Sequence, residues 1–189
     1  TCIWISSFIE LKEINVFNYA DQIVRQLQQG VLLISHAEGK TNAMTISWGA
    51  LGIDFGEPVF TTYVRSGRFT RELIDKSGEF TVAVPLGDNP VAKKALGFCG
   101  SRTGREIDKL KEAGLTTVEP EVISTFGVKE MQLILECRVV YRQEKTTEGM
   151  DKDAFAKWYP QNVGSDCCWA NRDLHVTYEG QIVKAYIQE

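Results

Sequence analysis

A series of short β-rich runs separated by tight turns most constrains what this chain can fold into. The run 31–37 (VLLISHA) ends at the turn Glu38-Gly39-Lys40, and the next run, 41–49 (TNAMTISWG), alternates cleanly. Runs of this length, bounded by turn residues, predict antiparallel strands joined by hairpins. The further predicted strands are 57–64, 79–85, a long strand over 131–142, and a closing hairpin of 174–178 and 181–187 around the turn Glu179-Gly180.

Helical spacing appears before the first of these runs and in the connections between the others. It predicts helices over 18–29, closed by Gly30, and over 66–78, a helical and loop-like middle over 89–115, and a short helix over 151–159. The chain contains neither a GxGxxG motif nor a phosphate-binding P-loop motif, so nothing favours a parallel dinucleotide-binding sheet. We therefore predict a mainly β fold, a small antiparallel barrel with helical insertions, as one domain over 12–189. Residues 1–11 form an N-terminal lead of unclear origin.

Composition excludes several classes of protein. The 189 residues carry a net charge of −4, and that acidic balance argues against a nucleic-acid partner and against an anionic membrane surface. No apolar run approaches the roughly 20 residues that span a bilayer, and 1–11 lacks the basic start and the cleavage site of a signal peptide.

The five cysteines are few, odd in number and without metal-ligand spacing, so we predict no metal site and a reducing, cytoplasmic location. The pair Cys167-Cys168 leaves two interpretations open, namely buried small apolar residues or a redox-active pair.

The run 41–49 places different residue types on its two faces. Met44, Ile46 and Trp48 share one face, which is bulky enough for a core, while Ala43, Thr45 and Ser47 share the other. The small, hydroxylated face leaves room for a flat ligand. An edge strand with solvated hydroxyl groups would show the same pattern, so this segment alone leaves both interpretations open.

Three arginines in seven residues stand where a predicted strand turns into a helix. Arg65, Arg68 and Arg71 flank the helix start, where backbone amides favour an anion and guanidinium groups match phosphate oxygens. A solvated basic turn is the alternative. Taken together with the small strand face, the turn predicts a site for a flat, phosphorylated cofactor.

At this point the residues resemble a known family. The stretches NAMTISWG (42–49), GIDFGEP (52–58), RSGRFT (65–70) and EFTVAVP (79–85) are similar to the flavin reductase-like, FMN-binding split-barrel family, and within it to the flavoredoxin branch. Residues 99–101 with Asp108-Lys109 resemble a second block of that branch. The resemblance covers 31–115 and is specific as a set, while the C-terminal third matches less diagnostically.

The resemblance implies a homodimer of split barrels that binds FMN near the subunit interface. By motif position, Met44, Thr45, Ile46, Ser47 and Trp48 would line the flavin ring and the ribityl chain. Arg65, Ser66, Arg68 and Thr70 would hold the phosphate, and Ser101 and Lys109 would reach the cofactor from the second block. His175 is the remaining titratable group near such a site, and its strand pattern favours an exposed or interfacial position over a catalytic one.

For a flavin protein, the lack of an acid/base motif is no obstacle, because the cofactor carries the chemistry. Three functions remain open. The first is an oxidoreductase in which NAD(P)H delivers a hydride to FMN. The second is an FMN-containing electron carrier that exchanges electrons with a redox protein and has no nicotinamide turnover. The third is a barrel that binds another ligand without redox chemistry.

The strand 131–142 gives a physical reason to expect a dimer. Its odd positions are apolar, and its even positions carry Ile134 and Val140 among charged and polar residues. Partial burial of that second face against another subunit accounts for the mixture. Trp158, Tyr159 and Trp169 add further apolar surface.

Overall fold

The computed structural model describes residues 10–167 and 169–188, so the predictions for 1–9 and for Cys168 lie outside the described residues. The strands are β1 (Leu11–Glu13), β2 (Val31–Ala37), β3 (Lys40–Ile46), β4 (Gly49–Asp54), β5 (Glu57–Arg65), β6 (Glu79–Val84), β7 (Thr117–Val118), β8 (Gly127–Val128), β9 (Leu133–Glu144) and β10 (His175–Gln188). The helices are η1 (Val16–Tyr19), a 3₁₀ turn, and α1 (Ala20–Gln29), α2 (Phe69–Ser77), α3 (Pro90–Ser101), α4 (Lys109–Glu112) and α5 (Lys152–Trp158).

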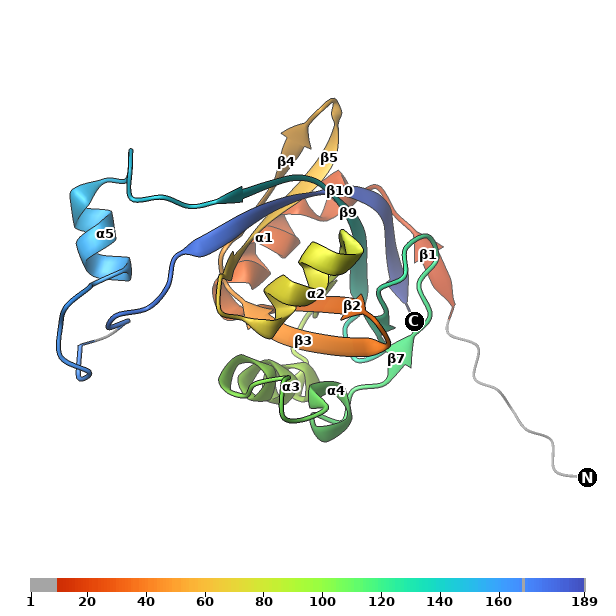
Figure 1. Ribbon diagram of the computed structural model, residues 1–189. Coiled ribbons are helices and arrows are strands. Elements are labelled where there is room, and N and C mark those ends of the chain that lie inside the picture. The colour runs from red at the N-terminus through yellow and green to blue at the C-terminus, as the bar shows by residue number, and fades with distance from the viewer. Residues whose placement is uncertain (1–9, 168, 189) are drawn as a thin grey trace, which may run out of the picture.

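The main sheet is antiparallel and curls into a barrel (Figure 1). Its strand order is β3-β2-β6-β9-β10-β5-β4, and β1 pairs with β10. The two strands at the ends of this order, β3 and β4, are consecutive in the chain and are joined by Ser47 and Trp48 alone. A two-residue link forces the ends of the sheet together without pairing them in the ladder. The predicted mainly β, antiparallel split barrel is therefore confirmed.

Two apolar layers hold the barrel. The inner layer includes Leu33 of β2 and Phe60 and Phe80 from other strands, and η1 and α1 add side chains to it. The outer layer lies between the sheet and the segment that contains α3 and α4, and it includes Leu32 and Ile34. Because β2 is covered on both faces, its sequence is a nearly continuous apolar run rather than an alternating one.

The predicted hairpin at Glu179-Gly180 is wrong, because β10 runs continuously for 14 residues through both of them. Gly180 is required there for space rather than for a turn. A Cβ atom at this position would lie 2.4 Å from Cζ of Phe80 and 2.8 Å from Cβ of Cys137. The ladder between β10 and β9 also shifts register between Glu179 and Gly180, which marks a bulge.

The face of β9 that carries the even-numbered residues is covered in part by this chain itself, whereas we predicted that another subunit covers it. Ile134 is fully buried within its own chain, in the outer layer. Glu136 is fully buried too, and its carboxylate accepts hydrogen bonds from the backbone N–H groups of Glu121, Val122 and Ile123. The segment before β9 therefore covers this face, and Ile134 no longer argues for a dimer.

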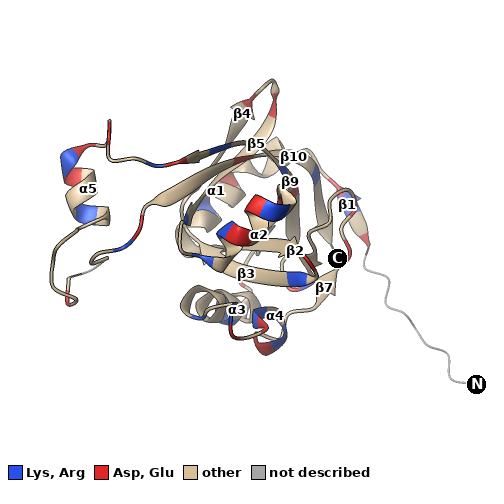
Figure 2. Ribbon diagram, in the orientation of Figure 1, with Lys and Arg blue, Asp and Glu red and all other residues tan. Residues whose placement is uncertain are grey.

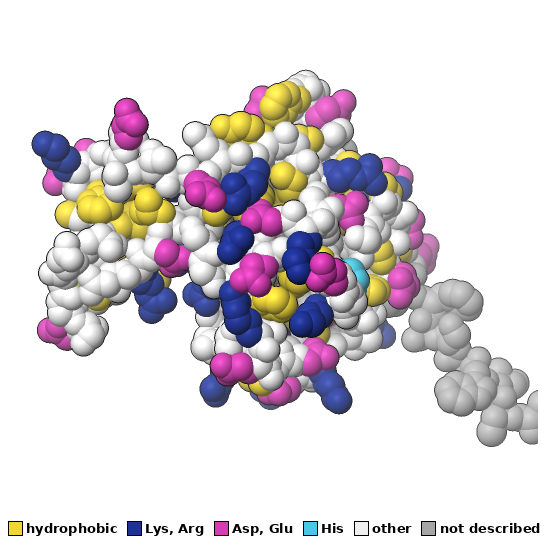
Figure 3. Space-filling view, viewed as in Figure 1, with side chains coloured by type: hydrophobic (Ala, Val, Ile, Leu, Met, Phe, Trp, Pro, Cys, Tyr) yellow, Lys and Arg dark blue, Asp and Glu magenta, His cyan; other side chains and the backbone are white. Residues whose placement is uncertain are grey.

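Residues 145–167 and 169–174 form an arm that joins β9 to β10 and projects away from the barrel (Figure 1). The arm carries α5, in which no residue is buried. Figure 3 shows apolar side chains gathered on it. Asn162, Trp169 and Asn171 in the arm have positive φ angles of 58°, 64° and 52°.

Candidate functional site

A cavity of about 290 Å³ lies where the barrel is split. The end of β3 and the link to β4 form one wall, and β5, the start of α2, the arm and the start of β10 form the rest. The lining residues are Met44, Thr45, Ile46, Ser47, Trp48, Tyr63, Arg65, Arg68, Trp158, Trp169 and His175. The split thus produces a cavity with a largely aromatic wall.

The arm and the barrel meet at this cavity through ring contacts. The Trp48 ring centroid lies 5.1 Å from that of Trp158, edge to face, and 5.0 Å from that of His175. Trp158 and Trp169 lie 6.1 Å apart. These separations are in the range in which aromatic rings attract one another, so the arm is fastened to the cavity by its aromatic side chains.

His175, the first residue of β10, is buried against the arm. Its Nδ1 atom lies 2.6 Å from the Tyr159 hydroxyl oxygen, a hydrogen bond between two buried side chains. Burial, with help from the positive charges of Arg65 and Lys145, lowers the pKa of His175 to about 4. Burial also raises the pKa of Tyr159. At neutral pH both side chains are uncharged. Of the two positions predicted for His175, the exposed one is wrong and the interfacial one stays a prediction.

Arg65 is a buried cation, only 6% exposed. Its guanidinium carbon lies 5.3 Å from the Tyr159 ring centroid and 5.5 Å from that of Trp169, and its Nη1 donates to the Asp173 carbonyl oxygen. Burial lowers its pKa, although an arginine keeps its charge at any ordinary pH. Within the described chain, Arg65 forms no ion pair with a carboxylate.

A second, smaller chamber of about 90 Å³ adjoins the cavity, because Met44 and Arg68 line both. It lies at the start of α2, where Arg68 is the N-cap residue and provides no side-chain cap. Free N–H groups at a helix start favour an anion. The other basic residues that line the chamber are Arg102, Arg105 and Lys109.

Lys109 is 3% exposed, and its Nζ atom donates to the carbonyl oxygens of Ala43 and Cys99 at 2.9 Å each. Burial lowers its pKa. Two carbonyl bonds leave one of its three N–H donors for another partner at the chamber.

Asn42 supplies a group without a partner in the same chamber. Its Nδ2 donates to the Thr70 hydroxyl at 2.8 Å, while its Oδ1 is buried and has no hydrogen-bond partner. Gly104 faces it so closely that a Cβ atom there would lie 2.0 Å from Oδ1. A buried, unpaired acceptor is costly, so this corner of the chamber is suited to a ligand that donates a hydrogen bond.

The structure brings most of the predicted site residues together at the cavity and the chamber. The small face of β3 is only partly open, because Thr45 lines the cavity while Ala43 does not. Ala43 is fully buried in the outer layer, and the Thr45 hydroxyl donates to the Leu96 carbonyl oxygen of α3 at 2.6 Å. The last three residues of β3, Met44 to Ile46, and both residues of the link reach the cavity.

The remaining predicted residues divide into two groups. Thr70 and Lys109 line the basic chamber. Ser66 lines neither space, and its hydroxyl donates to the Leu174 carbonyl oxygen at 3.1 Å. Ser101 is exposed, and its hydroxyl bonds back to α3. Cys167 is exposed rather than buried, so the buried interpretation is wrong for that residue.

Sequence reasoning missed the arm's contribution to the site. The sequence patterns identify Trp158, Tyr159 and Trp169 only as surplus apolar surface, and they assign no role to Arg102 and Arg105. The arginines carried a usable signal, since they repeat the combination of glycine and arginine seen at 65–68. For the tryptophans, more than 100 residues after Trp48, no local pattern identified their neighbour.

Comparison with known proteins identifies the family. The flavin reductase-like domain matches residues 24–189, nearly the whole described chain. The chain belongs to the flavin reductase-like domain family. An uncharacterised protein of Archaeoglobus fulgidus is 34% identical over 113 residues, which is 60% of this chain and 61% of that protein. The chain thus matches about three fifths of the length of this curated relative.

Solved structures show the same fold as this flavin reductase-like chain. A flavoredoxin from Methanosarcina acetivorans is 22% identical with a TM-score of 0.62, covering 100% of this chain and 75% of its own. Nitrilotriacetate monooxygenase component B from Bacillus cereus is 19% identical with a TM-score of 0.61, covering 92% and 80%. Among the described residues, no helix is long and apolar enough to cross a membrane.

Proposed function

We propose that this flavin reductase-like protein binds FMN and acts as an oxidoreductase. The observation that carries the proposal is the pair of joined spaces, one walled by aromatic side chains and one basic at a helix start, which share Met44 and Arg68. A molecule with a flat ring system at one end and a phosphate at the other matches that pair. The structure of M. acetivorans flavoredoxin, of the same fold, is consistent with it.

The residues present fit the parts of FMN. The cavity of about 290 Å³ lies at the small end of the range for ligand sites, which suits one flat ring system. Arg68, Lys109 and the start of α2 would hold the phosphate, and the unpaired Oδ1 of Asn42 would accept a hydrogen bond from a ribityl hydroxyl group. When bound, FMN supplies hydride and single-electron chemistry.

The chain's own side chains would bind and orient the flavin and shield it from water. Trp48, Trp158 and Trp169 exclude water from one side of the cavity, and neutral His175 presents an imidazole without adding charge. Arg65 adds a fixed positive charge at the aromatic end, where it favours electron-rich ligands. Ser66 and Ser101 are proposed only as supports of the turns that carry the arginines.

The visible spectrum of the purified protein tests the flavin. We expect a yellow protein, or one that takes up added FMN with quenching of flavin fluorescence. A colourless protein that takes up neither FMN nor riboflavin would eliminate the flavin proposals and leave a barrel that binds another ligand.

The electron donor separates two versions of the proposal. In the first, NAD(P)H reduces the bound flavin by hydride transfer. In the second, the protein is an electron carrier that serves a redox protein. The second version is favoured by the size of the cavity, because its walls leave little space beside one ring system unless Trp158 and Trp169 of the arm move. Steady-state oxidation of NADH or NADPH with FMN present supports the first, and no turnover with either supports the second.

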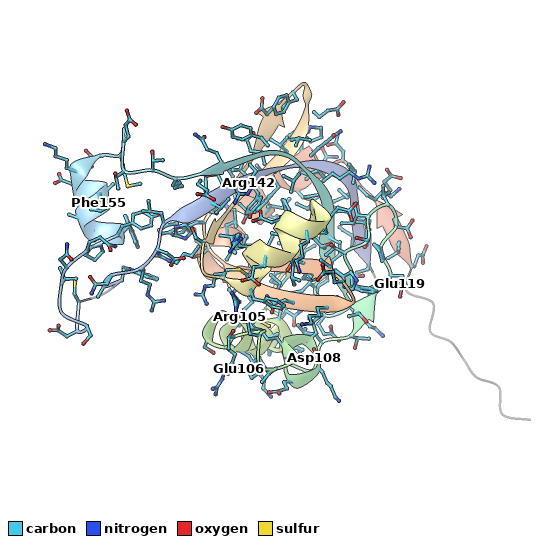
Figure 4. The ribbon with its side chains drawn as sticks, viewed as in Figure 1. Arg105, Glu106, Asp108, Glu119, Arg142 and Phe155 are labelled. Carbon is cyan, nitrogen blue, oxygen red and sulfur yellow. The ribbon has the colours of Figure 1, made fainter. Side chains whose placement is uncertain are left out.

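We also propose that the protein is a homodimer. The support is the arm, where α5 includes Phe155 and Trp158 yet buries none of its residues, and where Trp169 is 40% exposed (Figures 3 and 4). A second copy that covers the arm would bury this apolar surface. Light scattering at low micromolar concentration should give about twice the chain mass of 21.2 kDa. A mass of one chain with FMN bound would contradict the dimer.

A further inference from the structure

Three side-chain donors converge on the carboxylate of Asp75, in the last turn of α2. The Tyr178 hydroxyl of β10 donates to Oδ1 at 2.6 Å, and Nε of Arg142 in β9 donates to the same oxygen at 2.9 Å. Arg71, one turn earlier in α2, donates to Oδ2 at 3.1 Å. Figure 4 shows Arg142 next to α2, and Figure 2 shows charges of both signs on that helix. Asp75 is therefore bonded to two strands of the barrel and to its own helix.

The charge of Asp75 stands at an unfavourable place, because a negative charge near the C-terminal end of a helix opposes the helix dipole. Partial burial also works against the charge, but the hydrogen bonds from Arg142, Tyr178 and Arg71 outweigh it and lower the pKa of Asp75. The carboxylate is therefore ionised at neutral pH. Tyr178 is 1% exposed and belongs to the inner apolar layer. The carboxylate is thus fixed to a closely packed part of the barrel.

Arg71 connects this carboxylate to the turn that precedes α2. While its Nη1 bonds to Asp75, its Nε donates to the Ser66 carbonyl oxygen at 2.9 Å. Ser66 and Gly67 lead directly to Arg68, the N-cap residue, which lines both the cavity and the chamber. Arg71 itself lines neither space. Because a guanidinium donates in fixed directions, the position of the turn follows from that of the carboxylate.

We propose that Asp75 and Arg71 are positioning residues for the phosphate of FMN, which hold the turn so that Arg68 and the first N–H groups of α2 face the chamber. The proposal rests on the flavin site proposed above and adds two residues that line neither of its spaces. It makes Asp75, a negative charge, a residue that favours the binding of an anion. Asp75 lies about 10 Å after Arg68 along the helix axis, which is close to the screening distance of about 10 Å at 0.1 M salt, so its direct repulsion of the phosphate is weak.

Titration of the full-length protein with riboflavin and with FMN tests the proposal, with quenching of flavin fluorescence as the readout. Riboflavin lacks the phosphate, so the ratio of the two dissociation constants measures what the phosphate contributes. Asp75→Asn should weaken FMN binding about tenfold and leave riboflavin binding within about twofold of wild type. If charge alone mattered, this variant would bind FMN more tightly, so unchanged or tighter FMN binding would overturn the proposal. Equal losses for both ligands would also overturn it, because they would show a general support of the fold.

Asp21→Asn is the matched control, because Asp21 also pairs with an arginine one turn away, Arg25 in the exposed part of α1. Its affinities for riboflavin and FMN should equal those of wild type. If Asp21→Asn loses as much FMN affinity as Asp75→Asn, the proposal is overturned while the flavin site stands. If wild type binds neither ligand, the flavin site itself fails, and the positioning role fails with it.

Arg71→Lys gives a second test, which stands alone if Asp75→Asn does not fold. A lysine keeps the positive charge but lacks the planar fork that bonds to Asp75 and to the Ser66 carbonyl oxygen together. Arg71→Lys should therefore weaken FMN binding about tenfold and leave riboflavin binding unchanged. Wild-type affinity for FMN in Arg71→Lys would show that only the charge matters and would overturn the proposal.

Discussion

The barrel and the arm are held by different kinds of contact. In the barrel, Phe60 and Phe80 are fully buried, and Gly180 leaves no room for even one added carbon atom. In the arm, α5 buries nothing and Trp169 has a positive φ angle, a strained conformation for a bulky residue. The arm is held at the cavity by ring contacts, a buried arginine, one histidine and hydrogen bonds that Ser66 and Gly67 donate to its last two residues. Close packing thus defines the barrel, while the arm, which completes the site, has few contacts to resist displacement.

The largest effect should come from breaking the packing of the barrel. Gly180→Val places atoms where the Phe80 ring lies and should lower the free energy of unfolding by about 3 kcal/mol. Gly52→Val in β4 is the control, because a Cβ atom there meets nothing within 4 Å. Urea unfolding measures both. Equal stabilities of the two variants would show that the strand crossing at Gly180 is not tightly packed.

The second largest effect should come from removing an arginine that would hold the FMN phosphate on the barrel side of the site. Arg68→Ala should weaken FMN binding by about 1.5–3 kcal/mol, the range for hydrogen bonds to charged groups. The unfolding midpoint should stay the same, because Arg68 is not part of either apolar layer. Isothermal titration with FMN measures the change in affinity, and Arg25→Ala, at an exposed position, is the control. Wild-type affinity in both Arg68→Ala and Arg65→Ala would place the phosphate elsewhere.

The free energy of unfolding should depend on pH through His175, which lies between the barrel and the arm. Its pKa is about 4 in the folded chain and about 6.5 when unfolded. Between these values the unfolded chain binds the extra proton, so stability is complete above pH 6.5 and is lost as the pH falls toward 4. Wild type should lose on the order of 2 kcal/mol more than His175→Gln between pH 7 and pH 4. Urea unfolding at both pH values measures this difference.

His36→Gln, at the other histidine of the chain, is the matched control for that experiment. It should lose stability with falling pH as wild type does. If His175→Gln also follows wild type over the whole range, then the contact between His175 and Tyr159 does not keep the imidazole neutral.

The smallest effects compare two neighbouring hydroxyl residues. Thr45→Leu should lower the free energy of unfolding by about 1 kcal/mol. The Thr45 hydroxyl donates a hydrogen bond to α3, and the Thr45 Cβ atom lies so close to Gly100 that a Cβ atom added to that glycine would be 3.4 Å away. Ser47→Leu, at an exposed residue of the link, should change stability by less than about 0.5 kcal/mol but should weaken FMN binding. Thermal unfolding and FMN titration of both variants measure this. The reverse order of stabilities would mean that α3 does not seal the face that carries Thr45.

Local patterns in the sequence predicted the elements that local chemistry decides. Glu38 and Gly39 have φ angles of 52° and 73°, the turn geometry that closes a tight hairpin, and the predicted hairpin there is confirmed. The same logic failed at Glu179-Gly180, because a glycine that makes room for a ring 100 residues earlier in the chain looks the same in sequence as a turn glycine.

The site was predictable to the extent that its residues lie on one continuous segment. Met44 to Trp48 and Arg68 were predicted from adjacent motifs, and they do line the joined spaces. For His175, strand alternation places the side chain opposite Val176 and predicts an exposed or interfacial position. The structure buries both, since Tyr159 of the arm packs on the outward face. Alternation predicts which face a side chain is on, but not which distant segment covers that face.

The continuous β10 has a consequence for how the chain is synthesised. This strand pairs with β9, β5 and β1, so the last described residues are hydrogen-bonded to strands that span the chain, down to Leu11–Glu13. On a ribosome, the barrel therefore stays open, with the edges of β5 and β9 unpaired, until β10 has left the exit tunnel. Such long-range pairing folds slowly and exposes strand edges in the meantime. A nascent chain that stops within the arm would leave those edges free to pair with other chains. Addition of β10 is therefore the step that protects the chain from aggregation.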